Sequence, residues 1–141
     1  MKKIIKISLA AAFILLLVLL VSCKEETSSQ NIWENAIYTE DTELGEGALT
    51  LKTEVVADGK TVTFTVHTDA KTVGAALIEH GLIAGDEGDY GLYIKDVNGM
   101  KADYDIDQTY WAFYVNGEYA MSGADMTEID ESAVYRFERT K

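Results

Sequence analysis

The feature that most constrains the fold is a pair of alternating segments joined by Asp58-Gly59. Residues 48–57 and 60–68 flank this dipeptide, which favours the type I′ turn of a β-hairpin. Closing the hairpin on that turn makes one face largely apolar and the other polar, and a shift by one residue would destroy this agreement. The sequence therefore predicts a half-buried antiparallel hairpin. Its apolar cross-strand pairs are Val55 with Val62, Thr53 with Phe64, and Leu51 with Val66.

The segment after this hairpin predicts a short helix from Thr72 to His80. The Thr72 hydroxyl can cap the amino end, and Gly81 suits the left-handed position that follows a last helical turn. The acidic segment 85–89 is expected to be a loop. The apolar stripe of the helix comprises Val73, Ala76 and Leu77.

Two further hairpins are predicted at Asn98-Gly99 and Asn116-Gly117, because this dipeptide also favours type I′ turns. A last strand is expected at 133–138, where the sequence alternates. The predicted cross-strand pairs are Val97 with Met100, Asp96 with Lys101, Tyr93 with Tyr104, and Tyr114 with Tyr119.

Together these elements predict an α+β fold at 48–141, a small β-grasp-like domain of antiparallel hairpins with one short helix. Residues 23–47 are rich in Glu, Thr, Ser, Asn and Gln and are expected to form a flexible tether. Trp33 is one of the few apolar residues there, and we expect it to dock on the domain rather than to contact a ligand.

The amino terminus has the order of charge, apolar run and small residue that a signal peptide needs. Three lysines precede the uncharged run 7–21, which ends in Ser22 and the only cysteine, Cys23. Leu20-Val21-Ser22-Cys23 resembles the lipobox of bacterial lipoproteins. The resemblance implies cleavage after residue 22 and acylation of the Cys23 thiol, which places the protein on the outer face of the cytoplasmic membrane. The alternatives are an uncleaved membrane anchor and plain secretion.

The charge balance narrows the classes of partner. Removal of 1–22 would leave 9 basic and 24 acidic residues, a net charge of −15. Nucleic acid needs neutralising cations, and anionic lipid headgroups attract polybasic segments. The chain is therefore expected to bind no nucleic acid and to reach the membrane only through its lipid anchor.

Four stretches together resemble the transcobalamin C-terminal-like domain, which recurs in bacterial surface lipoproteins. They are Thr72-Val73-Gly74-Ala75-Ala76-Leu77, Gly81-Leu82-Ile83, Tyr93 through Asn98-Gly99, and Trp111-Ala112-Phe113-Tyr114-Val115-Asn116-Gly117-Glu118-Tyr119. In the vertebrate relatives this β-rich domain closes over cobalamin held against a much larger helical domain. The resemblance implies the fold and makes cobalamin or a related corrinoid a candidate ligand, with no resident cofactor.

The aromatic residues around the Asn116-Gly117 turn form the candidate site. Side chains alternate along a strand, so Trp111 and Phe113 would face one way and the tyrosines the other. A tyrosine cluster suits a flat, partly apolar ligand or a protein partner, and ordinary packing is the alternative. The predicted ligand-binding residues are Tyr110, Trp111, Tyr114, Asn116 and Tyr119.

Metal binding and catalysis have weaker support. Asp103-x-Asp105-x-Asp107 resembles the start of a calcium loop, but Gln108 and Tyr114 stand where that loop needs Gly and Glu. A solvated acidic edge is the alternative, although in an extended segment the three carboxylates would share one side. His67 and His80 lack a partner at helical metal-site spacing. We expect no metal site, and no nucleophile stands in a recognisable catalytic setting, so we expect no enzymatic activity.

The resulting hypothesis is a lipid-anchored, extracytoplasmic binding module. It would bind cobalamin or a related small ligand and feed a membrane transporter. The alternative is a cell-surface module that binds another protein and no small molecule.

Overall fold

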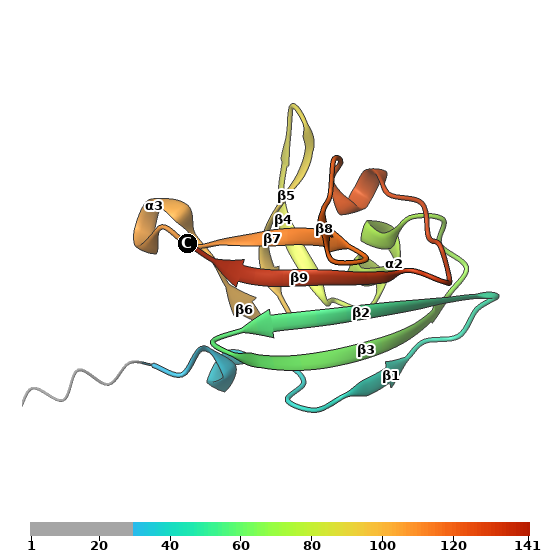
Figure 1. The fold of residues 1–141 in the computed structure, drawn as a ribbon, viewed down its shortest axis with the longest axis horizontal. Helices are drawn as coiled ribbons and strands as arrows, with labels where there is room; N and C mark the ends of the chain where they lie inside the picture. The colour runs from blue at the N-terminus through green and yellow to red at the C-terminus, as the bar shows by residue number, and fades with distance from the viewer. Residues whose placement is uncertain (1–29) are drawn as a thin grey trace, which may run out of the picture. The chain divides into compact units, whose positions relative to one another are not determined.

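The computed structural model describes residues 30–141, and residues 31–141 form one compact unit (Figure 1). The predicted signal peptide at 1–22 and the predicted lipidation site Cys23 lie outside the described residues. Within 30–141, no helix has the length and apolar character needed to cross a bilayer.

The larger of two sheets is mixed and has six strands in the order β1-β3-β2-β9-β7-β8. β2 pairs in parallel with β9, and β1 pairs in parallel with β3. The prediction of antiparallel hairpins alone is therefore wrong for these two pairings. The strands are β1 (Thr42–Leu44), β2 (Leu49–Ala57), β3 (Lys60–Thr68), β7 (Tyr110–Val115), β8 (Glu118–Tyr119) and β9 (Val134–Thr140).

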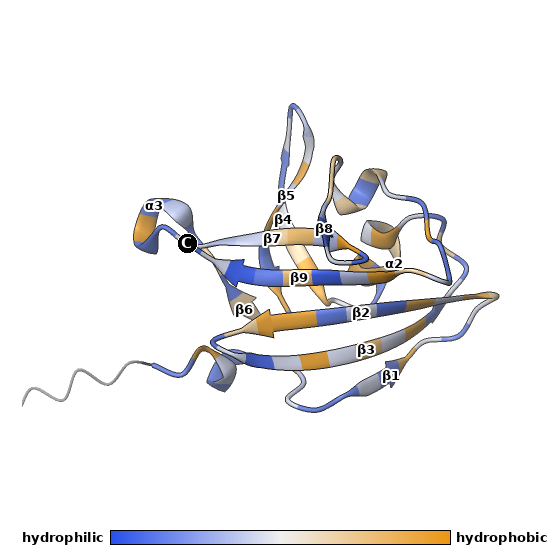
Figure 2. Ribbon diagram, viewed as in Figure 1, coloured by the Kyte–Doolittle hydropathy of each residue, from blue (hydrophilic) through white to orange (hydrophobic). Residues whose placement is uncertain are grey.

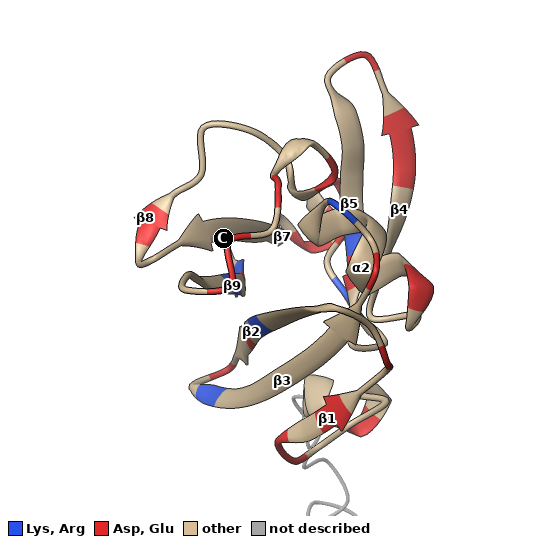
Figure 3. Cartoon of the chain, turned by 90° about the vertical axis from the view of Figure 1, so that its right-hand side faces the viewer, with Lys and Arg blue, Asp and Glu red and all other residues tan. Residues whose placement is uncertain are grey.

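The second sheet is antiparallel and has the order β4-β5-β6, with β4 (Ile83–Gly88), β5 (Gly91–Val97) and β6 (Met100–Lys101). It lies with α2 (Val73–Glu79) on one face of the larger sheet (Figure 3). A second short helix, α3 (Tyr104–Asp107), and the 3-10 turns η1 (Ile32–Asn35) and η2 (Ala124–Met126) complete the chain. The protein is thus mostly β-sheet with two short helices, one more than predicted. The finer β-grasp assignment stays a prediction.

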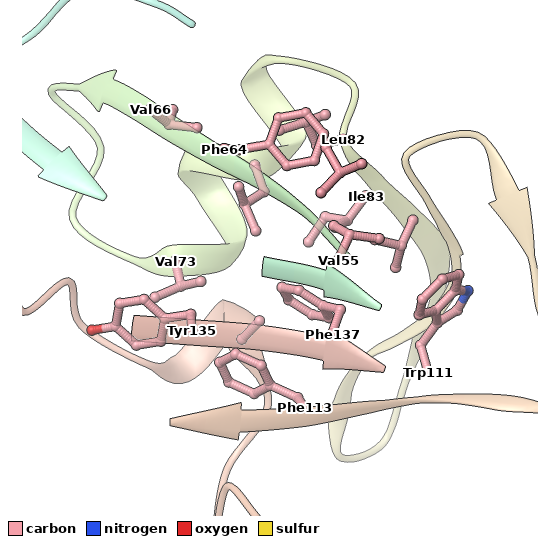
Figure 4. Packing of buried hydrophobic residues seen from close by; sticks show 14 of the residues in the cluster. Val55, Phe64, Val66, Val73, Leu82, Ile83, Trp111, Phe113, Tyr135 and Phe137 are labelled. Atoms are coloured by element: carbon pink, nitrogen blue, oxygen red, sulfur yellow. The ribbon is translucent and has the colours of Figure 1, made fainter. Parts of the chain in front are cut away.

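The β2–β3 hairpin is confirmed with its predicted register. Asp58 and Gly59 have φ values of 48° and 77°, as a type I′ turn requires. Leu51, Phe64 and Val66 are fully buried, and they belong to the same core cluster as the apolar side chains of α2 and β9 (Figure 4). The hairpin therefore contributes six of the 21 buried residues of the core cluster.

The predicted helix is confirmed as α2. The Thr72 hydroxyl accepts a hydrogen bond from the Ala75 amide at 3.2 Å, and Gly81 takes the left-handed conformation with φ of 65°. The predicted stripe is buried, as are Leu82 and Ile83 after the helix. Capping and burial of one stripe together explain why so short a segment is helical.

The flexible tether is contradicted from residue 31 onward. Its later part forms η1 and β1, because β1 pairs with β3 and closes the edge of the large sheet. The docking of Trp33 is confirmed: its side chain is 6% exposed, and its Nε1 donates a hydrogen bond to the Ala57 carbonyl at 2.9 Å. The folded unit thus begins about 17 residues before the predicted boundary, counted from Asn31 to Ala48.

Two local predictions are also wrong. The segment 85–89, expected to be a loop, lies mostly in β4, which pairs with β5 up to the pair Gly88 and Gly91. The predicted pairing of Tyr93 with Tyr104 is the second wrong prediction. Tyr93 pairs with Asp86 of β4, and Tyr104 is the first residue of α3, which Asp103 caps. The Asn98-Gly99 hairpin is confirmed only for its two pairs nearest the turn.

Candidate ligand-binding groove

A groove of about 580 Å³ lies between β5, β7 and the segment from Tyr119 to Met126. Its walls are three separate parts of the chain, which meet because β5 contacts both β7 and η2. None of the residues that line it is charged. Six are aromatic: Tyr90, Tyr93, Tyr110, Trp111, Phe113 and Tyr119.

The floor of the groove belongs to the hydrophobic core. Trp111 is 7% exposed and Phe113 9% exposed, and both point to the inner face of the large sheet (Figure 4). Phe113 stacks on Phe137 with ring centroids 4.9 Å apart. Because these rings are fixed by packing on several sides, the floor presents a rigid apolar surface.

The rim, in contrast, exposes large apolar side chains. Tyr90 is 100% exposed, Met121 101% and Met126 69%. Tyr90 lies between β4 and β5, Met121 follows β8, and Met126 is the last residue of η2. Exposed apolar side chains gathered around a groove are typical of a binding surface.

Asp125 links two walls of the groove. Its Oδ2 accepts a hydrogen bond from the Leu92 amide at 3.2 Å. A Cβ added at Gly91 would lie 2.8 Å from Oδ2, and one added at Gly123 would lie 2.7 Å from Oδ1. The carboxylate therefore fits only because both neighbours are glycine.

Two buried polar atoms beside the groove lack a hydrogen-bond partner among residues 30–141. They are the Asp125 Oδ1 atom and the Trp111 Nε1 atom. An unpaired buried group of this kind typically costs about 1–3 kcal/mol. Asp125 belongs to η2 and Trp111 to β7, so two walls of the groove each carry a polar atom without a partner.

The structure brings together three of the five predicted site residues. Tyr110, Trp111 and Tyr119 line the groove, whereas Tyr114 and Asn116 do not. Tyr114 packs edge-on against Tyr119, with ring centroids 5.6 Å apart.

Asn116 has a structural role in the β7–β8 turn. It adopts φ of 51° in the turn, and its Oδ1 accepts a hydrogen bond from the Val134 amide at 2.9 Å. The predicted faces of β7 are confirmed for Trp111 and Phe113, which are buried. Residues on β5 and after β8 were missed, because no local pattern links those segments to β7.

The acidic segment at 103–107 does not form a shared site. Asp103 accepts a hydrogen bond from the Asp105 amide, and Asp107 accepts bonds from the Thr109 hydroxyl and amide and pairs with Arg139 at 2.9 Å. The Thr109 hydroxyl is the main cause that lowers the pKa of Asp107. Residues 104–107 are helical, so the extended backbone that would put the three carboxylates on one side is not formed.

Imidazoles and metal-ligating clusters add no second site. His67 lies on the outer face of the large sheet, with Nε2 2.6 Å from Glu43 and Nδ1 3.2 Å from Thr50. Over the described part of the chain, no group of three or more His, Cys, Asp or Glu side chains could hold a metal ion.

Comparisons with known proteins bear on the fold. Residues 70–134 match a family described as a domain of unknown function (DUF4430). A structure from Ruminococcus gnavus ATCC 29149, described as a candidate metal binding protein, is similar with a TM-score of 0.63 and 28% identity, over 67% of this chain and 98% of that one. Haptocorrin in complex with Cbi is similar with a TM-score of 0.57 and 18% identity, over 70% of this chain and 26% of haptocorrin. No curated protein matches the chain.

The likeness to haptocorrin confirms the predicted transcobalamin-like fold and, at this identity, concerns the fold alone. The chain spans about a quarter of haptocorrin but nearly the whole of the Ruminococcus protein.

Proposed function

We propose that the protein is a binding module whose groove takes a flat, partly apolar small molecule. The observation that supports this most is the groove itself, with a rigid aromatic floor, an exposed rim of tyrosine and methionine, and a volume of about 580 Å³. Ligand pockets usually have volumes of about 300–1,000 Å³ and a mostly apolar lining with a few polar groups. Here the Tyr hydroxyls and Ser122 supply those polar groups.

A corrinoid is the candidate ligand. The sequence resemblance implies it, and the fold is shared with haptocorrin, whose structure contains Cbi. A corrin ring is flat and carries amide groups at its edge, so its face would lie on Trp111 and Phe113 and its edge would reach the tyrosines. Since the rim is exposed, the groove would cover one face of the ring and leave the other open.

The proposal includes the location and the route of the ligand. Cys23, in the lipobox-like segment, would carry the lipid, and two or more acyl chains give stable anchoring. The module would then hold its ligand at the outer face of the cytoplasmic membrane and pass it to a transporter there. This role requires binding and release, and no catalysis.

Calorimetric titration of the full chain in lipid nanodiscs tests ligand binding, with cyanocobalamin and cobinamide as probes. We expect saturable heat, and we expect the double variant Tyr90→Ala, Met121→Ala to weaken binding at least about tenfold through lost apolar contact. Tyr104→Ala is the matched control, since Tyr104 is also exposed but lies outside the groove. An absence of heat with both probes would contradict the corrinoid assignment.

Mass spectrometry of the amino-terminal peptide tests the anchor separately. We expect a diacylglyceryl group on Cys23 and no residue before it. Intact, unmodified Met1–Cys23 in membrane fractions would contradict this part of the proposal.

The second candidate is a protein-interaction module, favoured by the full exposure of Tyr90 and Met121. Aromatic residues and methionine are enriched at interfaces. In that case titration with corrinoids gives no heat. A photo-crosslinking residue at position 90 then crosslinks the chain to one surface protein, and Met121→Ala lowers the yield of that crosslink.

A further inference from the structure

Resting on the proposed function, we propose that the groove selects a cationic amphiphile, a flat apolar body that carries a positive charge. The lining itself is uncharged and largely aromatic. The groups placed around it are carboxylates from three different walls. An aromatic groove inside an acidic collar attracts cations and repels anions.

The first wall contributes Glu87. Glu87 pairs with Leu92 across the β4–β5 hairpin, and side chains of directly opposed residues lie on the same face. Leu92 and the neighbouring Tyr93 both line the groove, so Glu87 lies directly opposite a lining residue. Both Glu87 and its neighbour Asp89 are exposed, and Figure 3 shows the acidic tip of this hairpin.

The second wall contributes Glu118. It pairs with Val115 across the β7–β8 turn. Val115 lies two residues after Phe113, so it shares the face that Phe113 presents to the groove. The register thus places a second exposed carboxylate on the same face as the aromatic floor.

The third wall contributes Asp125. Its Oδ2 is used by the Leu92 amide, whereas its buried Oδ1 has no partner among the described residues. This carboxylate lies under the groove wall formed by Gly123 and Ala124. Its charge is therefore only partly compensated by the protein.

One lysine of the described residues lies close to the lining, and its charge is paired. Lys95 Nζ lies 5.9 Å from the centroid of the Tyr93 ring, and it binds Asp86 at 2.8 Å. Between residues 72 and 135 the only other Lys or Arg is Lys101, which lies on β6 opposite Asp96. Arg139, opposite Trp111 in register, binds Asp107 and the Lys101 carbonyl.

The aromatic rings add a second attraction of the same sign. A cation within about 6 Å of an aromatic ring face is attracted by the ring quadrupole. Four tyrosines and Trp111 are among the residues that line the groove. A neutral molecule of the same shape gains the apolar contact, but it gains neither the attraction of the carboxylates nor that of the aromatic rings.

Three ring-matched probes test this: N-methylacridinium as the cation, acridine at pH 8 as the neutral form, and acridine-9-carboxylate as the anion. The full chain is titrated in nanodiscs of zwitterionic phosphatidylcholine, with empty nanodiscs as the blank. We expect the cation to bind about tenfold more tightly than the neutral probe, and the anion more weakly than both, with the preference falling as salt rises. Equal affinities, or tightest binding of the anion, would overturn the inference and leave the proposed function standing. Binding of none of the three would contradict the proposed function itself.

Charge-neutral variants assign the effect to the collar. Glu87→Gln and Glu118→Gln together are expected to reduce the cation preference to about threefold or less without changing acridine affinity. Glu34→Gln, on η1 and outside the groove, removes an acid elsewhere and is the matched control. A preference unchanged in the double variant, or reduced equally in the control, would overturn the role of the collar.

Discussion

The hairpins β2–β3 and β4–β5 have the same construction but different roles. Each joins two antiparallel strands through a two-residue turn. In β2–β3 the burial alternates along both strands, whereas in β4 the five residues 84–88 are all exposed. Figure 2 shows the same contrast in hydropathy. The first hairpin forms the core and the second extends away from it.

The difference shows where each hairpin finds its stability. The β2–β3 register is determined by burial, because a slip would expose every core side chain. The β4–β5 tip is held by backbone pairing, by the Asp125 bond to Leu92 and by the Lys95–Asp86 pair. Segments with few buried contacts open at low free energy, and binding walls are commonly drawn from them.

The largest expected effect separates the two hairpins directly. Phe64→Ala removes a fully buried ring from β3 and should lower the free energy of unfolding by about 3–5 kcal/mol. Tyr90→Ala removes a fully exposed ring from the β4–β5 tip and should change it by less than about 0.5 kcal/mol. Urea unfolding followed by circular dichroism measures both. Similar losses in the two variants would show that the β4–β5 tip is part of the cooperative core.

A smaller effect tests the pairing within β4–β5. A Cβ at Gly85 would lie 1.9 Å from the Tyr93 carbonyl oxygen, whereas a Cβ at Gly88 would lie 3.5 Å from the Gly91 oxygen. Gly85→Ala should therefore separate the strands near the bulge, at a cost of about 1–3 kcal/mol. Gly88→Ala, on the same strand, is the matched control and meets only ordinary contact.

Hydrogen exchange of the amides at 85–93 reports this opening without requiring global unfolding. We expect faster exchange in Gly85→Ala and exchange close to that of the unmodified chain in Gly88→Ala. Unchanged protection in Gly85→Ala would mean that the bulge adapts to a side chain.

How much of the fold could be predicted depends on whether a pattern within a few neighbouring residues marks each element. The Asp58-Gly59 turn and the alternation beside it are local, and they correctly predicted the β2–β3 register. The parallel pairing of Lys52 with Val134 joins residues far apart in the chain, and no local pattern marks it. Glycine and acidic residues predicted a loop at 85–89 because β4 buries almost nothing that would show as alternation.

The site was predictable only for the part that lies on one strand pair. Tyr110, Trp111 and Tyr119 share the β7–β8 hairpin, and their clustering was visible in the sequence. Tyr90 and Met121 come from two other segments, and only the tertiary fold places them around the same groove. Asn116 was assigned to the site from its position, although the turn itself requires it.

The β2–β3 hairpin contains a buried hydroxyl without a hydrogen-bond partner among the described residues. The Thr53 side chain is 1% exposed, and its Oγ1 has no partner among residues 30–141. Thr53→Val replaces that hydroxyl by a methyl group of similar size, so it should leave stability unchanged or raise it by up to about 1 kcal/mol. Urea unfolding measures the change. A clear loss would show that a water molecule satisfies this hydroxyl.

The smallest expected effect concerns the ion pair between Lys95 and Asp86, which joins β5 to β4. Asp86 raises the pKa of Lys95, first through the hydrogen bond and then through its charge. Since the pKa is higher in the folded chain, the pair stabilises the hairpin at neutral pH and its contribution is lost as pH rises past about 10.5, the ordinary pKa of lysine. The melting temperature of Asp86→Asn should accordingly lie slightly below that of the unmodified chain at pH 8, and the two should converge above pH 11. Tyrosines also titrate in this pH range, but they do so in both proteins. The difference between the two melting temperatures at each pH therefore does not contain their contribution. A difference in melting temperature that persists above pH 11 would assign the effect to hydrogen bonding or β-propensity at position 86. The hairpin tip would then depend on its backbone pairing and on the Asp125 bond to Leu92.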